Sequence, residues 1–205
     1  MLGGLIMAHG DDNGLRVPPR VAPIQAYVTI VKDGDGVAAE AGKLRDALRD
    51  AGIRVGYDDR TDTAFGRRAV DAELKGYPVR IEVGPRDLAS GNVTLVTRVD
   101  GAKRPVPLDE AVEATTRALR ETQETLLAQA RTRREERTAD VSTVDEAIAA
   151  ATDGWARLPW SKVGVDGENT ANAQGVTVRC LTRADGSVPD SEDEPDLVAY
   201  LARAY

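Results

Sequence analysis

The 205-residue sequence contains a single cysteine, Cys180, and a single histidine, His9. One cysteine excludes a disulfide within the chain, which fits a reducing, cytoplasmic setting. One histidine with few convergent partners favours neither a zinc site nor a Ser–His–Asp triad. Aromatic residues make up only 4% of the chain, so the core has to be built mainly from Val, Leu, Ile and Ala.

Long hydrophobic runs and nucleotide-binding motifs are also lacking. No segment approaches the ~20 apolar residues of a membrane-spanning helix, and the first ten residues lack the basic region of a signal peptide. No glycine-rich phosphate loop with its Lys-Ser/Thr pair occurs. Asp33–Gly36 resembles half of a calcium-binding loop, but Leu44 stands where such a loop needs Glu. We therefore expect no membrane association and no metal bound by this chain.

Charge is unevenly distributed around the net value of −7. Residues 24–104 carry 14 basic and 13 acidic residues, whereas residues 105–205 carry 11 basic and 19 acidic residues. Non-specific binding to phosphates depends on local positive charge, so this distribution argues against a protein that coats DNA. Only the middle segment is suited to a polyanion, and its surface is expected to be mixed in charge.

The order of local patterns indicates more than one domain. Leu2–Met7 is apolar and is followed by Gly10, as at the end of a helix, and Asp11–Gly14 has turn residues. The proline-rich stretch 18–23 then favours extended backbone. A strand begins only at Ile24. This order predicts the end of one domain, a proline hinge and the start of a second.

From Ile24 onward, strand and helix patterns alternate as in an α/β layer with a largely parallel sheet. The predicted strands are 24–31, 53–57, 79–83 and 92–99, and the predicted helices are 38–51, 66–74 and 108–129. The charged run at 131–137 is expected to be an exposed helix or helix end. Thr143 and Glu146 form a capping box that opens a helix at 145–151. A strand at 177–181 and a short apolar segment at 197–205 complete a small α+β module.

Polar residues that could bind a ligand concentrate between residues 58 and 97. Glu73 lies near the end of a predicted helix, Arg80 lies in the next strand, and Arg86-Asp87 lie in the turn after it. Such ends can converge on one edge of an α/β sheet. A carboxylate accepts from N1–H and N2–H₂ of guanine, while arginine donates to O6 and N7. The spacing therefore fits a reader of guanine in a single-stranded RNA loop, and it fits an ordinary surface network of ion pairs as well.

Several blocks resemble prolyl-tRNA synthetases of the archaeal/eukaryotic-like type. They are, in order, HGDDNGLRVPPRVAPIQ, DDR, FG, AELKGYPVRIEVGPRDL and the terminal LARAY. The resemblance covers essentially the whole chain and is strongest in residues 3–98. It implies that residues 1–23 are the end of a class II catalytic domain plus a Pro-rich linker. Residues 24–124 would form an α/β anticodon-binding domain with a mixed five-stranded sheet and helices, and residues 125–205 a small α+β C-terminal domain.

The resemblance also implies the site. Glu73, Arg80, Arg86 and Asp87 would line the anticodon site, where tRNA(Pro) presents two constant guanines. Arg86 replaces the lysine of the family pattern, which keeps the charge and changes the geometry. Ala69 stands where the family often has an aromatic residue, so a stacking contact is expected to be missing.

The remaining implications concern the full-length enzyme. That enzyme is a homodimer that uses ATP and Mg to attach proline to tRNA, and its ATP- and proline-binding residues lie upstream of this stretch. We therefore expect no catalytic residue here. Zinc is not expected either, because Ser161 falls near the first cysteine position of the family module and SEDEPDL replaces the last pair. Tyr205 matches the family's terminal tyrosine, which implies a native C-terminus and truncation at the front only.

Three functions stay open at this point. The chain could be the non-catalytic, tRNA-binding portion of a proline–tRNA ligase. It could be a stand-alone regulatory protein that binds tRNA or a synthetase. It could be a structural remnant whose acidic half is an interaction surface. The four retained site residues favour the tRNA-binding portion and the regulatory protein over the structural remnant. The segment Leu2–Met7 is expected to pack loosely or to mediate self-association, because its former neighbours are absent.

Overall fold

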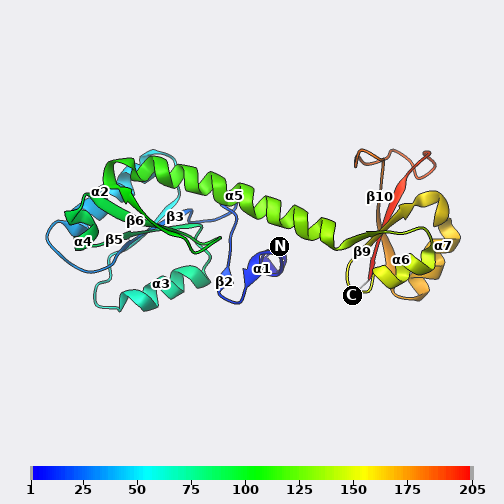
Figure 1. Ribbon diagram of the computed structural model, residues 1–205, viewed down its shortest axis with the longest axis horizontal. Coiled ribbons are helices and arrows are strands. Elements are labelled where there is room, and N and C mark those ends of the chain that lie inside the picture. The colour runs from blue at the N-terminus through cyan, green and yellow to red at the C-terminus, as the bar shows by residue number, and fades with distance from the viewer. Residues whose placement is uncertain (1, 204–205) are drawn as a thin grey trace. The chain divides into compact units, whose positions relative to one another are not determined.

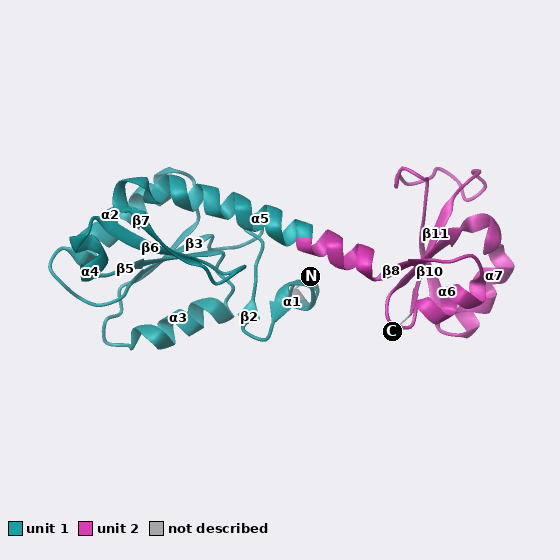
Figure 2. Cartoon of the chain, in the orientation of Figure 1, with its two compact units in different colours: residues 1–128 teal, residues 129–205 magenta. Residues whose placement is uncertain are grey.

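The computed structural model describes residues 2–203. These residues form two compact units, with the boundary between residues 128 and 129 (Figure 2). The boundary between the units lies inside one continuous helix, α5 (Ala111–Glu136). The charged run at 131–137 is therefore almost entirely the end of this helix, as predicted. Within the described residues no helix is both long enough and apolar enough to cross a bilayer.

The first unit opens with helix α1 (Leu2–His9) and a two-stranded hairpin, β1 (Gly10–Asp11) and β2 (Gly14–Leu15). The predicted helix end and turn are confirmed. The side chains of Ile6 and Met7 are exposed, which fits the loose packing expected of this helix. Self-association through it stays a prediction.

A five-stranded sheet forms the centre of this unit, in the order β4-β3-β5-β6-β7. Strand β3 pairs in parallel with β4 and β5, whereas β6 and β7 are antiparallel additions. The mixed sheet implied by the resemblance is thus confirmed, and the largely parallel sheet predicted from the alternation is wrong. The strands are β3 (Ala26–Ile30), β4 (Val55–Asp58), β5 (Val79–Val83), β6 (Asn92–Thr97) and β7 (Lys103–Pro107).

The short strands β1 and β2, the edge strand β7 and the helix between β5 and β6 were not predicted. Strand β7, with the sequence KRPVP, has two prolines in five residues, which is tolerated because it lies at the edge of the sheet. The short helix α4 (Pro85–Ala89) begins with a proline after Gly84 and returns the chain from β5 to β6. Because the return is this short, β6 has to run antiparallel to β5. A 3₁₀ turn at Leu108–Glu110 precedes α5.

The two faces of the sheet differ in chemistry. One face is apolar and packs against α2 (Val37–Asp50) and the first half of α5, forming the core of the unit. The opposite face is polar and is covered in part by α3 (Phe65–Leu74), which lies on the other side of the sheet from α5 (Figure 1). On this face lie Tyr27, Thr29, Asp58, Arg80, Glu82, Thr94 and Lys103.

Arg68 joins α3 to the polar face. Its guanidinium is fully buried, donates to the main-chain oxygens of Ile30 at 2.7 Å and Thr63 at 3.0 Å, and lies 3.6 Å from Asp58. Asp58 also accepts two hydrogen bonds from the side chain of Arg60, which hold the pKa of the buried carboxyl down to about 2. The helix therefore packs on this sheet through paired charges rather than through an apolar seam.

The second unit has a four-stranded sheet in the order β10-β11-β9-β8, with a core of small and branched apolar residues. The capping box is confirmed, because Thr143 Oγ1 accepts from the amide of Glu146 and Glu146 Oε2 accepts from the amide of Thr143. The elements are β8 (Thr138–Asp140), α6 (Val144–Ala150), β9 (Trp155–Pro159), a 3₁₀ turn (Trp160–Lys162), α7 (Gly164–Ala173), β10 (Val176–Thr182) and β11 (Val198–Arg203).

The predicted small α+β module and its strand at 177–181 are confirmed, whereas β8, β9, α7 and β11 were not predicted. Helix α7 has the sequence GVDGENTANA, whose glycines and polar residues give little helical signal. Within residues 2–203, no group of three or more His, Cys, Asp and Glu side chains is arranged to hold a metal ion. The interpretation of Tyr205 lies outside the described residues.

Candidate nucleic-acid interface

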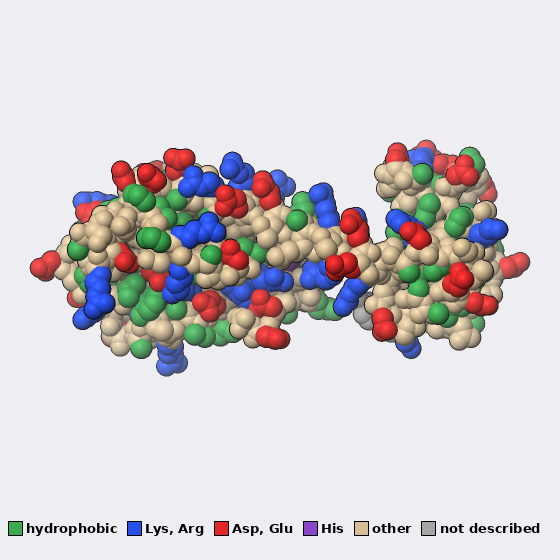
Figure 3. Space-filling view, viewed as in Figure 1, with side chains coloured by type: hydrophobic (Ala, Val, Ile, Leu, Met, Phe, Trp, Pro, Cys, Tyr) green, Lys and Arg blue, Asp and Glu red, His purple; other side chains and the backbone are tan. Residues whose placement is uncertain are grey.

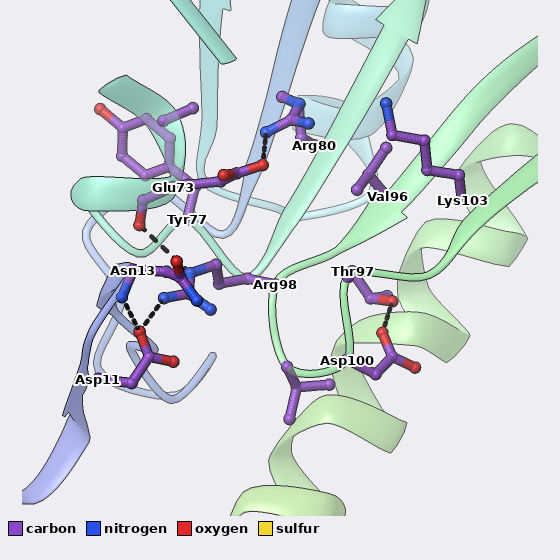
Figure 4. A pocket seen from close by; sticks show the side chains of 13 residues that line it. Asp11, Asn13, Glu73, Tyr77, Arg80, Val96, Thr97, Arg98, Asp100 and Lys103 are labelled. Carbon is purple, nitrogen blue, oxygen red and sulfur yellow. Dashed lines mark hydrogen bonds and ion pairs between the residues drawn. The ribbon is translucent and has the colours of Figure 1, made fainter. Parts of the chain in front are cut away.

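Arg80 is the centre of the polar face. It alternates along β5 with Val79 and Ile81, so its side chain points toward the α3 side while theirs fill the core. Its Nε and Nη2 donate to Glu82 Oε1 at 3.1 and 2.9 Å. Its Nη1 donates to Glu73 Oε1 at 3.2 Å (Figure 4) and to the main-chain oxygen of Ala69 at 3.2 Å. The predicted residues Glu73 and Arg80 are thus in direct contact.

The two carboxylates that hold Arg80 differ in their access to solvent. The side chain of Glu73 is 42% exposed, whereas that of Glu82 is 8% exposed and that of Arg80 is 6% exposed. Glu82 is therefore the buried partner and Glu73 the solvent-facing one. Solvent therefore has access to the contact of Arg80 with Glu73 and much less to its contact with Glu82.

The end of α3, which carries Glu73, is held by the β1–β2 hairpin. Gly14 and Gly76 both have positive φ, 115° and 71°, and a Cβ on Gly14 would lie 2.5 Å from the Cα of Leu74. Arg98 Nε donates to the main-chain oxygen of Glu73 at 3.3 Å, and Arg98 Nη2 donates to Asp11 Oδ1 at 2.6 Å. The hydrogen bond from Arg98 lowers the pKa of the Asp11 carboxyl.

A cavity of about 430 Å³ opens beside the Glu73–Arg80 contact. This volume falls in the range of small-ligand sites. Its wall carries hydrogen-bond donors and acceptors, and both basic and acidic side chains (Figure 4). The lining includes Asp11, Asn13, Glu73, Tyr77, Arg80, Thr97, Arg98, Asp100 and Lys103, all from the first unit.

Asp87 lies further along the same face, and Arg86 precedes it on α4. Asp87 Oδ2 accepts from Thr94 Oγ1 at 3.1 Å, and Thr94 is paired across the sheet with Glu82. Arg86 is exposed on α4, and its guanidinium makes no hydrogen bond or ion pair with the described residues. Its donors are therefore free for an external ligand.

The arrangement differs from the expected convergence at one sheet edge. Arg80 lies in the first half of β5 and meets Glu73 there, while Arg86 and Asp87 follow the carboxyl end of the strand. Glu73, Arg80 and Asp87 are instead related along one face, through Glu82 and Thr94, whereas Arg86 is exposed beside Asp87 on α4. The return of the chain by the antiparallel strand β6 produces this arrangement, since Thr94 faces Asp87 from β6.

Sequence reasoning missed Glu82, Lys103, Asp11 and Arg98. Glu82 could have been found, because VRIEV places it two residues after Arg80 and hence on the same face of a strand. Lys103 lies on β7, opposite Val96, and its Nζ is 3.5 Å from Glu82 Oε1. Asp11 and Arg98 are far apart in the sequence, and no local pattern joins them.

The surface around the site mixes both signs of charge. Figure 3 shows Lys and Arg side chains interspersed with Asp and Glu side chains over the visible face of the first unit. This fits the mixed surface predicted for the middle segment and distinguishes it from the strongly basic surfaces of proteins that coat nucleic acid. Recognition at such a surface depends on particular hydrogen bonds more than on summed charge.

Comparisons with known proteins give this site its context. Residues 25–117 match the family described as "Anticodon binding domain". The whole chain is 53% identical to proline–tRNA ligase 2 of Streptomyces avermitilis and 54% identical to proline–tRNA ligase of Frankia alni, and covers 44% of each. The chain corresponds to the C-terminal portion of prolyl-tRNA synthetases. All of its described site residues from Glu73 to Lys103 lie within the matched anticodon-binding domain.

Solved structures agree with this correspondence. The chain matches a crystal structure of prolyl-tRNA synthetase from Cryptosporidium parvum, complexed with L-proline and AMP, with a TM-score of 0.84 and 27% identity. It covers 46% of that chain. The chain thus spans less than half the length of the synthetases that it matches.

Proposed function

We propose that this region binds the anticodon loop of tRNA(Pro) and reads its guanines through Glu73, Arg80, Arg86 and Asp87. The observation that carries the proposal is the contact of solvent-facing Glu73 with the buried guanidinium of Arg80 beside a cavity. Glutamate accepts from N1–H and N2–H₂ of guanine, and arginine donates to O6 and N7. A pair of this kind rejects adenine, which has a donor where guanine has O6.

The activity of the whole synthetase is part of the same proposal. We infer that the longer protein attaches proline to tRNA with ATP and Mg and works as a homodimer in the cytoplasm, and that residues 1–205 take no part in the chemistry. The chain's own role is then to select the tRNA. DNA and membranes are not among the partners that we propose, and the second unit is expected to fold without zinc, on its own apolar core.

The direct test is binding of the purified chain to tRNA(Pro) and to a variant with both anticodon guanines replaced by adenine. The proposal expects the native anticodon to bind at least about tenfold more tightly, since each good bidentate contact discriminates by about 1–3 kcal/mol. The preference should survive moderate salt, because base contacts release few counterions. Equal, weak and salt-sensitive binding to both RNAs would contradict the proposal.

Matched variants link the preference to the site. Arg80→Lys keeps the charge but loses the planar fork, so we expect it to lose most of the preference for guanine. Arg117→Lys makes the same substitution on an exposed face of α5 and should keep the preference. If both variants bind like the unsubstituted chain, Arg80 does not read the anticodon.

A further inference from the structure

We propose that Glu82 is a positioning residue, which holds the guanidinium of Arg80 so that one edge faces the base to be read. This inference rests on the proposed function and adds to it a residue that never has to touch the RNA. It assigns different tasks to the two carboxylates around Arg80. Glu73 turns to the base, and Glu82 stays on the arginine.

The hydrogen bonds of Arg80 define which edge is presented. A guanidinium has five N–H donors, arranged on a rigid plane. Glu82 Oε1 accepts from Nε and Nη2 and so occupies one side of this plane. The edge formed by Nη1 and Nη2 therefore points away from Glu82. On this edge the solvent-facing partner is Glu73, which meets Nη1.

Burial explains why a second carboxylate is needed. The side chain of Arg80 is 6% exposed, and an arginine buried to that degree is stable only beside a counter-charge. If Glu73 turns toward the N1–H and N2–H₂ of a base, it no longer pairs with Nη1. Glu82 then becomes the remaining carboxylate partner of Arg80 among the described residues.

Lys103 is a second cationic partner of Glu82 beside Arg80. Its Nζ lies 3.5 Å from the same Oε1 atom, on the solvent side of the pair. Glu82 also lies opposite Thr94, which binds Asp87, so it stands between the two halves of the predicted site. A shift of Glu82 would therefore disturb the readout by Arg80 before it disturbed that by Glu73.

The test uses a short anticodon stem-loop RNA in three forms: with guanine, with 7-deazaguanine, which has C–H in place of N7, and with inosine, which lacks the 2-amino group. The unsubstituted chain should bind the guanine form about 5- to 10-fold more tightly than each analogue, as expected for loss of one well-placed hydrogen bond. The first analogue reports on Arg80 and the second on Glu73.

Glu82→Gln should reduce the preference for guanine over 7-deazaguanine to below about twofold while keeping the preference over inosine, because glutamine gives Arg80 a weaker acceptor without charge. Glu113→Gln makes the same change on an exposed part of α5 and should keep both preferences. Circular dichroism and urea unfolding should establish that each variant is folded at the temperature of the binding assay. Glu82→Asp restores the charge and should recover part of the lost preference.

Three results would overturn the inference. Glu82→Gln could keep both preferences, or it could lose both to the same extent, as a merely structural defect would. Alternatively, the unsubstituted chain could show no preference for guanine over adenine at the same positions. Only this last result would also refute the proposed function.

Discussion

Arg98 and Asp11 form an ion pair across 87 positions of the sequence, with 2.6 Å between Arg98 Nη2 and Asp11 Oδ1. The same guanidinium donates through Nε to the main-chain oxygen of Glu73. One arginine therefore joins the N-terminal hairpin, the sheet and the end of the helix that carries a predicted anticodon-reading residue. The position of Glu73 depends on a segment that precedes the anticodon-binding domain in the sequence.

We expect Asp11→Asn to lower the free energy of unfolding by about 1 kcal/mol near neutral pH. The pKa of Asp11 is lower in the folded protein, so its contribution is present above the unfolded pKa and is lost as the pH falls through the folded pKa. The difference between variant and unsubstituted chain should thus shrink below about pH 4. Urea unfolding near neutral pH and below about pH 4 measures this difference. Asp12→Asn, on an exposed neighbour, should have no comparable effect, and a difference independent of pH would contradict this account.

Asp58 should contribute more than Asp11 to the loss of folding stability at acidic pH. Its pKa is held to about 2 by Arg60, and Arg68 lies beside it. Because the folded pKa is depressed, this stability is complete above the unfolded value of about 4 and disappears as the pH falls toward about 2.

Asp58→Ala should cost about 3–5 kcal/mol near neutral pH, because it leaves the charge of Arg68 buried without its carboxylate. Unfolding in urea, followed by far-UV circular dichroism, would measure the loss. Asp59→Ala, at the exposed neighbouring position, serves as the control. Similar values for both variants would show that the pair under α3 is not what stabilises the helix on the sheet.

The hairpin should not tolerate a side chain at Gly14. A Cβ there would lie 2.5 Å from the Cα of Leu74, so Gly14→Ala has to displace either the hairpin or the end of α3. Gly91 also has a positive φ but faces open space, so Gly91→Ala reports the backbone strain alone, about 1–2 kcal/mol. We expect Gly14→Ala to be clearly the more destabilising of the two in urea unfolding. Equal effects would mean that the close approach is readily relieved.

Arg86→Ala should weaken binding of the guanine-containing stem-loop by about tenfold, the loss of one good charged contact. Stability should be unchanged, because the side chain is exposed and unpaired within the described residues. Arg67→Ala, on an exposed position of α3, is the matched control. A loss of affinity that is equal for both variants and for RNAs with and without guanine would indicate phosphate contact only.

The second unit should not depend on zinc. We expect treatment with a strong chelator to leave its melting temperature unchanged, and metal analysis of the purified chain to find no stoichiometric zinc. The physical reason is that the second unit already has a core of buried Ala, Leu and Val side chains to stabilise its fold. A large fall in melting temperature on chelation, reversed by added zinc, would refute this prediction.

Much of the secondary structure could be predicted from local patterns. Helix α2 repeats its buried residues at helical spacing, VRIEV alternates as a strand, and the Thr143–Glu146 box begins α6 where expected. These signals are local, because hydrogen bonds within one turn and the alternation of side chains along a strand need only neighbouring residues. Elements with weak local signals, such as β7, β8 and α7, were missed, since pairing with a neighbouring strand or packing on the core stabilises them.

The sequence alone determined the types of residue available for the site. It provided Glu73, Arg80, Arg86 and Asp87 near the ends of predicted elements, together with the resemblance that linked them to an anticodon. The tertiary structure decided how they are related. The antiparallel return of β6 placed the site along a face instead of an edge, and the fold brought Asp11 to Arg98 and gave Arg80 a second carboxylate in Glu82. Burial and long-range contact exist only once the chain is folded, so the exposure that separates Glu73 from Glu82 could not be predicted from their spacing.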